Sequence, residues 1–287
     1  MQTIINEASS GGKTPLNTGK KSQKSEGAVK TYFLARADFS FADEVALKSK
    51  SNWDTAKANK DIIPMYQVEA IEDNNTEDTI ANKRFKDSKT KNGLRGVTYS
   101  HELSEEQDKA LRSYDESDEY TRIFGVTTEN EILCEIQEDG TIKGQPRTSF
   151  IVGVRTNSVD STEPVTKVMI KFDDYAMSNI KPDFKADDIE GIYDVKLVLV
   201  SATATSIKFK ALTYGGNIPN LTVANLVVKN VALETQTIGL NPLDSNTQTY
   251  EVTGTGFAND FTLDIDAVQK IGDVSYESEN ALVLTGI

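Results

Sequence analysis

The chain has 287 residues, of which 38% are hydrophobic, and its 44 acidic and 31 basic residues give a formal net charge of −13. This length allows two domains, this much apolar material excludes wholesale disorder, and one cysteine excludes an internal disulfide. The acidic balance disfavours nucleic-acid binding by charge neutralisation. No stretch approaches the roughly 20 apolar residues of a membrane span, and the N-terminal residues do not form the basic and apolar regions of a signal peptide, so we expect neither.

Charge is unevenly distributed along the chain. Residues 1–30 carry a net +3, residues 31–190 a net −11 and the final 97 residues a net −5. The common interpretation of an acidic surface is solubility. A more specific one is a surface past which DNA slides without binding.

Residues 1–29 are predicted to be a flexible basic arm. They are rich in Gly, Ser, Lys and Asn and have no apolar period, so burial does not offset their chain entropy. Gly12-Lys13-Thr14 matches the end of a phosphate-binding loop, but the first glycine of that motif would fall on Glu7. Pro15 follows and no helix is predicted there, so we do not expect ATP binding.

A β-rich domain with one principal helix is predicted over residues 30–175. Its early part contains a strand from Tyr32, a short helix at Asn52–Lys60 capped by Asn52, and apolar alternation over Ile62–Ala70. Glu72–Gly96 is a long polar stretch with few apolar anchors. Loops of this length inside a compact domain are usually functional or disordered, so we interpret it as a projecting loop.

The principal helix is predicted at Glu105–Tyr114. Ser104 and Gln107 have the spacing of a capping box, in which each side chain satisfies a backbone amide of the other residue. Asp139-Gly140 indicates a tight turn. Strands are expected at residues 120–126, 131–136, 149–156 and 165–172, the last with Val168, Ile170 and Phe172 on one face.

Residues 176–191 are predicted to be a linker, and residues 192–287 a β-sandwich. Ile192–Val200 alternates apolar and polar residues, and short strands separated by Gly, Pro and Asn follow it. Such a module serves display or contact, and it does not by itself identify what is contacted.

The stretch Leu240-Asn-Pro-Leu243, followed by Thr249-Tyr250-Glu-Val252, resembles the approach to strand F in fibronectin type III and bacterial Ig-like domains. The resemblance implies that Tyr250 is a corner tyrosine whose hydroxyl bonds back to the preceding corner. It implies as inward residues Val195, Leu197, Ile207, Phe209, Val252 and Leu263. The chain departs from the family because its one tryptophan, Trp53, lies outside the module and Cys134 has no disulfide partner. A generic β-sandwich is the alternative.

Few residues could carry chemistry. His101 is the only histidine, so metal sites with several His ligands are excluded, and without a Gly-x-Ser-x-Gly elbow we expect it to be a surface or capping residue. Cys134 is either a core thiol or lies on the opposite face of its strand. Asp115–Glu119 and Asp187-Asp188 do not have calcium-loop spacing. A glycosidase needs only two carboxylates, at a separation that sequence does not reveal. We predict no catalytic, cofactor-binding or metal-binding residue, no cofactor and no enzyme activity.

Over residues 30–287 the predicted architecture resembles the lambda-like tail tube proteins of long-tailed phages, some of which carry a C-terminal Ig-like domain. The resemblance implies a structural virion protein assembled in the bacterial host cytoplasm. It implies hexameric rings that stack, contact other tail or neck proteins, and conduct DNA without tight binding or a membrane partner. Residues 72–96 would be the stacking loop, and residues 1–29 would bridge subunits.

Several alternatives remain open at this point. A neck or head–tail connector ring and a capsid decoration protein are related structural roles. A glycan-binding or adhesive surface protein with the Ig-like module as an accessory is a different class, as is a small hydrolase with an Ig-like appendage.

Overall fold

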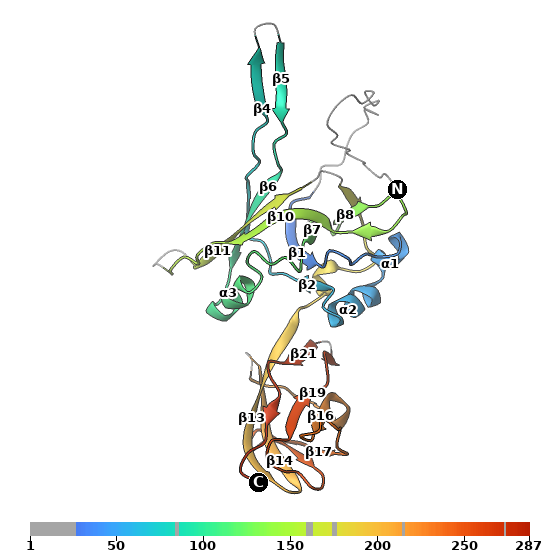
Figure 1. The fold of residues 1–287 in the computed structure, drawn as a ribbon, viewed down its shortest axis with the longest axis vertical. Helices are drawn as coiled ribbons and strands as arrows, with labels where there is room; N and C mark the ends of the chain where they lie inside the picture. Colours follow the sequence, from blue (N-terminus) through green and yellow to red (C-terminus); the bar gives the residue numbers. More distant parts are fainter. Residues whose placement is uncertain (1–26, 84–85, 159–162, 174–176, 214–215, 273) are drawn as a thin grey trace. The chain divides into compact units, whose positions relative to one another are not determined.

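A computed structural model describes residues 27–83, 86–158, 163–173, 177–213, 216–272 and 274–287 of the chain (Figure 1). The predicted basic arm at residues 1–29 lies almost entirely outside the described residues. The chain is mainly β, as predicted, with a β-rich region followed by a sandwich-like one. It forms two compact units, Met1–Ile189 and Glu190–Ile287.

The first unit is built on one sheet with the strand order β12-β8-β7-β10-β11-β6-β3, to which β1, β2 and β9 add at the side. Every pairing in it is antiparallel. The strands are β1 (Val29–Ala35), β2 (Ile62–Pro64), β3 (Ala70–Asp73), β6 (Gly96–Glu102), β7 (Arg122–Thr127), β8 (Ile132–Ile136), β9 (Ile142–Lys143), β10 (Gln145–Val152), β11 (Val165–Phe172) and β12 (Ser178–Ile180).

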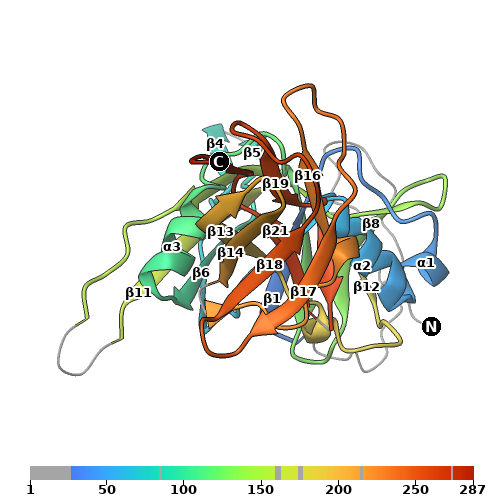
Figure 2. The same ribbon diagram turned by 90° about the horizontal axis from the view of Figure 1, so that it is seen from below.

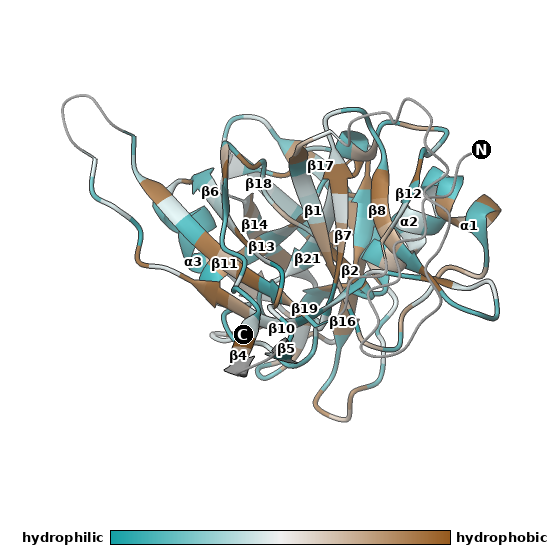
Figure 3. Cartoon of the chain, turned by 90° about the horizontal axis from the view of Figure 1, so that it is seen from above, coloured by the Kyte–Doolittle hydropathy of each residue, from teal (hydrophilic) through white to brown (hydrophobic). Residues whose placement is uncertain are grey.

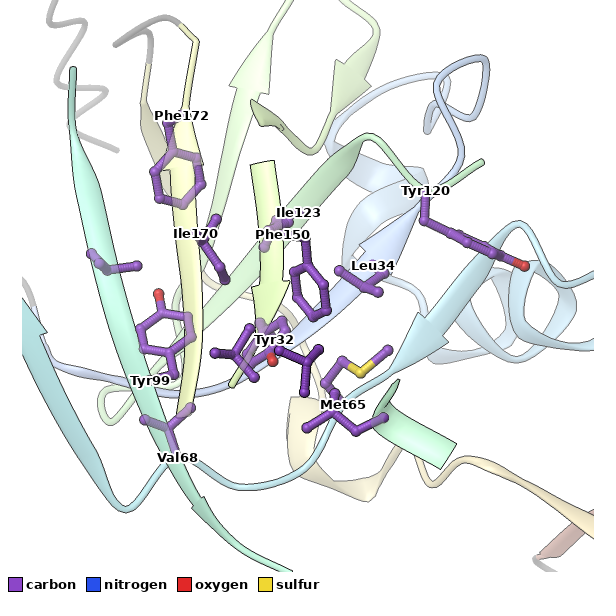
Figure 4. Packing of buried hydrophobic residues seen from close by; sticks show 14 of the residues in the cluster. Tyr32, Leu34, Met65, Val68, Tyr99, Tyr120, Ile123, Phe150, Ile170 and Phe172 are labelled. Carbon is purple, nitrogen blue, oxygen red and sulfur yellow. The ribbon is translucent and has the colours of Figure 1, made fainter. Parts of the chain in front are cut away.

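Both faces of this sheet are buried around β1, because its alternate side chains enter two different cores. Tyr32 and Leu34 belong to the first core, which Leu111 of helix α3 (Glu105–Arg112) covers. Figure 4 shows this packing, with Tyr32 and Leu34 facing a group of side chains from neighbouring strands. Phe33 and Ala35 belong to the second core. The strand therefore reads as a continuous apolar run, as expected for a strand covered on both sides.

Helices α1 (Glu44–Lys48) and α2 (Lys50–Ala58) cover the second core. Trp53 of α2 is fully buried and donates its indole N–H to the carbonyl of Leu47 at 2.7 Å. Its ring centroid lies 4.8 Å from the ring centroids of both Phe33 and Phe41. Buried tryptophan requires such a partner for its one donor. The hydrophobic residues, brown in Figure 3, are prominent along β8 and β11.

The two predicted helices form close to their expected positions, but a further helix was not predicted. The Ser104–Gln107 capping box is present at the start of α3, with both reciprocal hydrogen bonds. The second helix begins after Ser49 rather than at Asn52, and Ser49 makes no side-chain cap bond. The described part of the chain has three α-helices, of which α1 was not predicted. None of them is long and apolar enough to cross a membrane.

The predicted linker at residues 176–191 is wrong for most of its length. It contains β12, which pairs with β8, and the 3-10 turn Ala186–Asp188. Ile180, Ala186 and Ile189 are buried in the second core. The segment looks like a linker in sequence because its few apolar residues are separated by charges, yet these residues complete the core of the first unit.

The second unit has the two sheets of an immunoglobulin-like sandwich. Its sheets have the orders β17-β18-β14-β13-β21-β20, with β15 beside β14, and β16-β19-β22. The first contains the A-B-E-D arrangement and the second the C-F-G arrangement. Figure 2 shows β13, β14, β18 and β17 side by side. The strands are β13 (Ile192–Thr203), β14 (Ser206–Thr213), β15 (Gly216–Asn217), β16 (Leu226–Lys229), β17 (Gly239–Asp244), β18 (Thr249–Thr253), β19 (Thr262–Ile265), β20 (Gln269–Ile271), β21 (Val274–Ser278) and β22 (Leu282–Val283).

All six residues predicted to point inward in this unit are buried: Val195, Leu197, Ile207, Phe209, Val252 and Leu263. Tyr250 is also buried, but it lies on β18, which corresponds to strand E rather than strand F. Its hydroxyl donates to the carbonyl of Ile218 at 2.7 Å and accepts from the amide of Leu221 at 3.2 Å. The expected bond to the preceding corner is therefore replaced by two bonds to a segment about 30 residues upstream.

Candidate assembly surface

The most distinctive surface of the first unit is a β-hairpin that continues beyond the sheet. Residues 72–96, predicted as a projecting loop, contain the strands β4 (Thr79–Lys83) and β5 (Lys86–Lys91), which pair with each other and with no strand of the sheet. We call residues 74–96 the arm from here on; they are distinct from the predicted basic arm at residues 1–29. Figure 1 shows it extending from the sheet above β6. The projection was correctly predicted, whereas the absence of regular structure was not.

The base of the arm is hydrogen-bonded across its two chains. The amide of Asn74 donates to the carbonyl of Gly96 at 3.0 Å, and the amide of Thr76 donates to the carbonyl of Leu94 at 2.9 Å. The amide of Leu94 donates in return to the Thr76 hydroxyl at 2.6 Å. These bonds continue the β3–β6 pairing, so the arm leaves the unit as an extension of that ladder.

Close contact of the two chains at the base depends on a glycine. A Cβ atom at Gly93 would lie 1.9 Å from the carbonyl oxygen of Thr76, a distance that no side chain can occupy. Asp78 accepts a hydrogen bond from the Gly93 amide at 2.7 Å and pairs with Lys89 at 2.6 Å. The Gly93 bond first, and the Lys89 ammonium second, hold the pKa of Asp78 below its ordinary value.

The arm has no hydrophobic core of its own among the described residues. The buried clusters of the first unit end at Val68 before it and resume at Val97 after it. Ile80 of β4 is 58% exposed. A two-stranded hairpin without a packed face is at best marginally stable in water. An arm of this kind gains stability when a partner covers it.

The arm is also basic, although residues 31–190 as a whole are acidic. Residues 79–91 contain five basic residues and one acidic residue, a net +4. The remainder of residues 31–190 contains 16 basic and 31 acidic residues, a net −15. The sign of the charge within residues 31–190 therefore changes at the hairpin that extends from the sheet.

The prediction that His101 is a surface or capping residue is wrong. It lies in β6 and is fully buried, with Nδ1 2.7 Å from the carbonyl oxygen of Gln67 and Nε2 3.2 Å from the hydroxyl of Tyr32. Desolvation lowers its pKa. With Gln67 accepting from Nδ1–H, the ring is neutral and Nε2 accepts from Tyr32. Both nitrogens are engaged inside the core, which leaves neither free to act on a ligand.

Of the two alternatives for Cys134, the structure supports the core thiol. It is fully buried in β8, and its sulfur lies 3.6 Å from the carbonyl oxygen of Ser178. Burial raises its pKa to about 12, so the thiol is protonated at neutral pH and is a poor nucleophile.

The acidic runs are distributed over the surface and pair with cations of the first unit. Asp187 pairs with Lys30 at 2.5 Å, and Glu119 pairs with Arg36 at 2.6 Å. Within the described ranges no group of three or more His, Cys, Asp or Glu side chains is arranged to hold a metal ion.

No known protein-family model matches the sequence, and a search of curated proteins finds no match.

Proposed function

We propose that the chain is a structural subunit that assembles with copies of itself through the arm. The observation that carries this proposal is a basic hairpin with an exposed Ile80 and no core among its described residues, attached to a well-packed unit. Its two chains are held at the base by a specific ladder and a glycine contact. The pairing of the two chains of this segment is fixed at the base, and the rest of its own unit leaves the segment uncovered. Such a segment is suited to packing against a neighbouring subunit.

The specific role that we propose is a tail tube subunit of a tailed phage, forming stacked rings that conduct DNA in the virion after assembly in the host cytoplasm. The sheet of the first unit is open, with β3 and β12 at the ends of its main path. All four residues of β3 are exposed. Ring closure would cover such edges, which otherwise invite uncontrolled pairing. The acidic remainder of the unit would repel the phosphates of passing DNA.

A connector ring and a capsid decoration protein are the related structural alternatives. The adhesive alternative is less well supported. Phe209, Tyr250 and Phe257 are buried, which leaves Tyr193, at 44%, as the prominently exposed aromatic side chain among the described residues of the second unit. We propose no enzymatic activity.

The test compares the full chain with a variant lacking the arm. Residues 75–95 are replaced by Asn-Gly, which joins the hydrogen-bonded pair Asn74 and Gly96 through a two-residue hairpin turn. Size-exclusion light scattering and negative-stain microscopy should show rings or tubes for the full chain and no stacking for the variant. The emission of the single buried Trp53 reports whether the first unit is still folded.

Three results would count against this function. A full chain that stays monomeric at high concentration removes the assembly role. Long tubes formed by the arm-deleted variant remove the arm from stacking. Duplex DNA binding by the full chain at moderate salt would contradict the conduit role, because the acidic surface should repel it.

A further inference from the structure

Asn92-Gly93 is the only Asn-Gly pair in the sequence, and it lies near the base of the arm. β5 ends at Lys91, so the pair directly follows that strand. Asn92 is exposed and Gly93 is half-buried. An asparagine that precedes a glycine can react with the backbone of its own chain, because glycine has no Cβ atom to hinder its nitrogen and permits the backbone rotation that the reaction requires.

The two chains of the arm are joined through a side chain at this point. Strand pairing ends at Lys91, and the next backbone hydrogen bond that the described residues make across the arm runs from Thr76 to Leu94. Between these two places the Gly93 amide donates to the carboxylate of Asp78 at 2.7 Å. A carboxylate oxygen therefore takes the place that a backbone carbonyl has in a regular ladder.

The acceptor that holds the Gly93 amide is itself accessible to water. The Asp78 side chain is 45% exposed, and its other oxygen pairs with Lys89, whose side chain is 46% exposed. Exposed pairs of this kind contribute little to stability, so water can replace both bonds. Each such opening releases the Gly93 nitrogen beside the exposed Asn92.

We propose that Asn92 is a site of spontaneous covalent modification, at which the Gly93 nitrogen attacks the side-chain carbonyl carbon, and that Asp78 restrains this attack. The Gly93 nitrogen loses its proton to solvent base and bonds to Cγ of Asn92. The bond from Cγ to the side-chain nitrogen breaks, and that nitrogen takes up a proton and leaves as ammonia. Water then opens the five-membered imide at either carbonyl, which gives aspartate or isoaspartate, and no oxidant or reductant is needed.

Two properties of the Asp78 contact slow the attack. The proton of the Gly93 nitrogen is not available to solvent base while it is hydrogen-bonded to the carboxylate. The negative charge of the carboxylate also opposes loss of that proton, because a second negative charge would form beside it. The hydrogen bond from Gly93, and then the Lys89 ammonium, hold the pKa of Asp78 below its ordinary value, so this charge persists throughout the neutral range.

The modification would open the base of the arm. Isoaspartate adds one atom to the backbone where Gly93 lies against the carbonyl of Thr76, and both products add a negative charge next to the residue that Asp78 binds. Like charges repel, so the bond from residue 93 to Asp78 weakens. The hydrophobic cores of the first unit include no described residue of the arm, and we expect them to stay folded.

The experiment follows the intact full chain at neutral and mildly alkaline pH. Peptide mapping by mass spectrometry measures how much of each asparagine is converted, and electron-transfer fragmentation distinguishes isoaspartate from aspartate. Asn92 should convert faster than every other asparagine and give both products. In oxygen-18 water each product should gain one labelled oxygen from the opening of the imide. The rate should rise about tenfold per pH unit, since the deprotonated fraction of a weak acid rises by that factor below its pKa.

Three variants of the full chain separate the reaction from its restraint. Asn92→Gln keeps an amide side chain but would require a six-membered imide, so this position should stay unmodified over the same period. Asp78→Ala removes the acceptor and should convert several-fold faster than the wild type. Asp78→Asn is the matched control, because it keeps a side-chain oxygen without the charge, and its rate should fall between the two. The emission of Trp53 reports that the first unit is folded in each variant.

Each contrary result would overturn a stated part of the inference. Conversion at Asn92 that is no faster than at the other asparagines overturns the site, as does conversion that occurs only after unfolding in urea. An Asp78→Ala variant that converts no faster than the wild type overturns the restraint. A converted chain whose Gly93 and Leu94 amides exchange hydrogen as slowly as before overturns the opening of the base. None of these results depends on whether copies of the chain assemble.

Discussion

The hydroxyl of Tyr250 is expected to stabilise the second unit through two backbone partners at once. It is 1% exposed, and it bonds the carbonyl of Ile218 and the amide of Leu221. Both of those residues are themselves buried. Tyr250→Phe keeps the ring, which stacks on Phe209 at 5.8 Å between centroids, and removes only the oxygen. The change therefore isolates the two hydrogen bonds.

The expected loss follows from leaving a buried donor and a buried acceptor without partners. Each such group costs about 1–3 kcal/mol, and partial relaxation brings the pair to about 2 kcal/mol. For a unit of this size, that corresponds to a fall in melting temperature of about 10 °C. Tyr193→Phe is the matched control, because Tyr193 is 44% exposed and its removal should change stability by less than about 0.5 kcal/mol.

The two units can be followed separately in the intact chain. Trp53, the single tryptophan, is buried in the first unit, so its emission follows that unit alone, while circular dichroism follows the strands of both. Tyr250→Phe should shift one dichroism transition and leave the Trp53 midpoint in place. Equal stability of the Tyr250 and Tyr193 variants would refute the reasoning, as would a shift confined to the Trp53 signal.

Three further changes test other parts of the structure. Because burial lowers the pKa of His101 below its unfolded value, the stability it contributes is present above about pH 6.5 and is lost as pH falls. The Trp53 unfolding midpoint should therefore drop between pH 7 and 5.5 in the wild type, and less steeply in His101→Gln. Leu233 is 75% exposed and has a φ of +64°, a backbone conformation that Asn adopts more readily than Leu. Leu233→Asn should therefore stabilise the second unit by about 0.5–1 kcal/mol and raise the midpoint of its dichroism transition. A lower midpoint would contradict backbone strain at Leu233. Gly93→Ala should open the base of the arm against Thr76, which speeds amide exchange there while Trp53 emission stays unchanged.

Sequence periodicity predicted the second unit better than the first. Strands that cover one face of a sandwich alternate strictly, so Ile207 and Phe209 could be assigned to the interior directly. The first unit buries both faces of β6, where Thr98, Ser100 and His101 lie inside with the apolar residues. Polar side chains in such a strand look exposed by pattern, and only the second layer packed over them reverses that expectation.

The arm was predictable in place but not in form. Its length and polarity indicate a projection, because little in it can be buried. Its strands were missed because Lys86–Lys91 has neither alternation nor β-branched residues beyond Thr90, and the pairing shifts register between Thr79 and Ile80. The useful signal was charge: counting residues 79–91 separately from their surroundings isolates the basic segment, whereas averaging over residues 31–190 hides it.

The same charge asymmetry would control both the solubility of single chains and the direction of their association. Most surfaces of the first unit carry the same sign, so most encounters between two copies are repulsive, and like charges brought together cost several kcal/mol. An encounter that brings the basic arm against the acidic surface of a second copy is attractive. Specificity would then come as much from the repulsion of wrong contacts as from the strength of the right one. A uniformly neutral surface would lose both the solubility of single chains and the direction of their association.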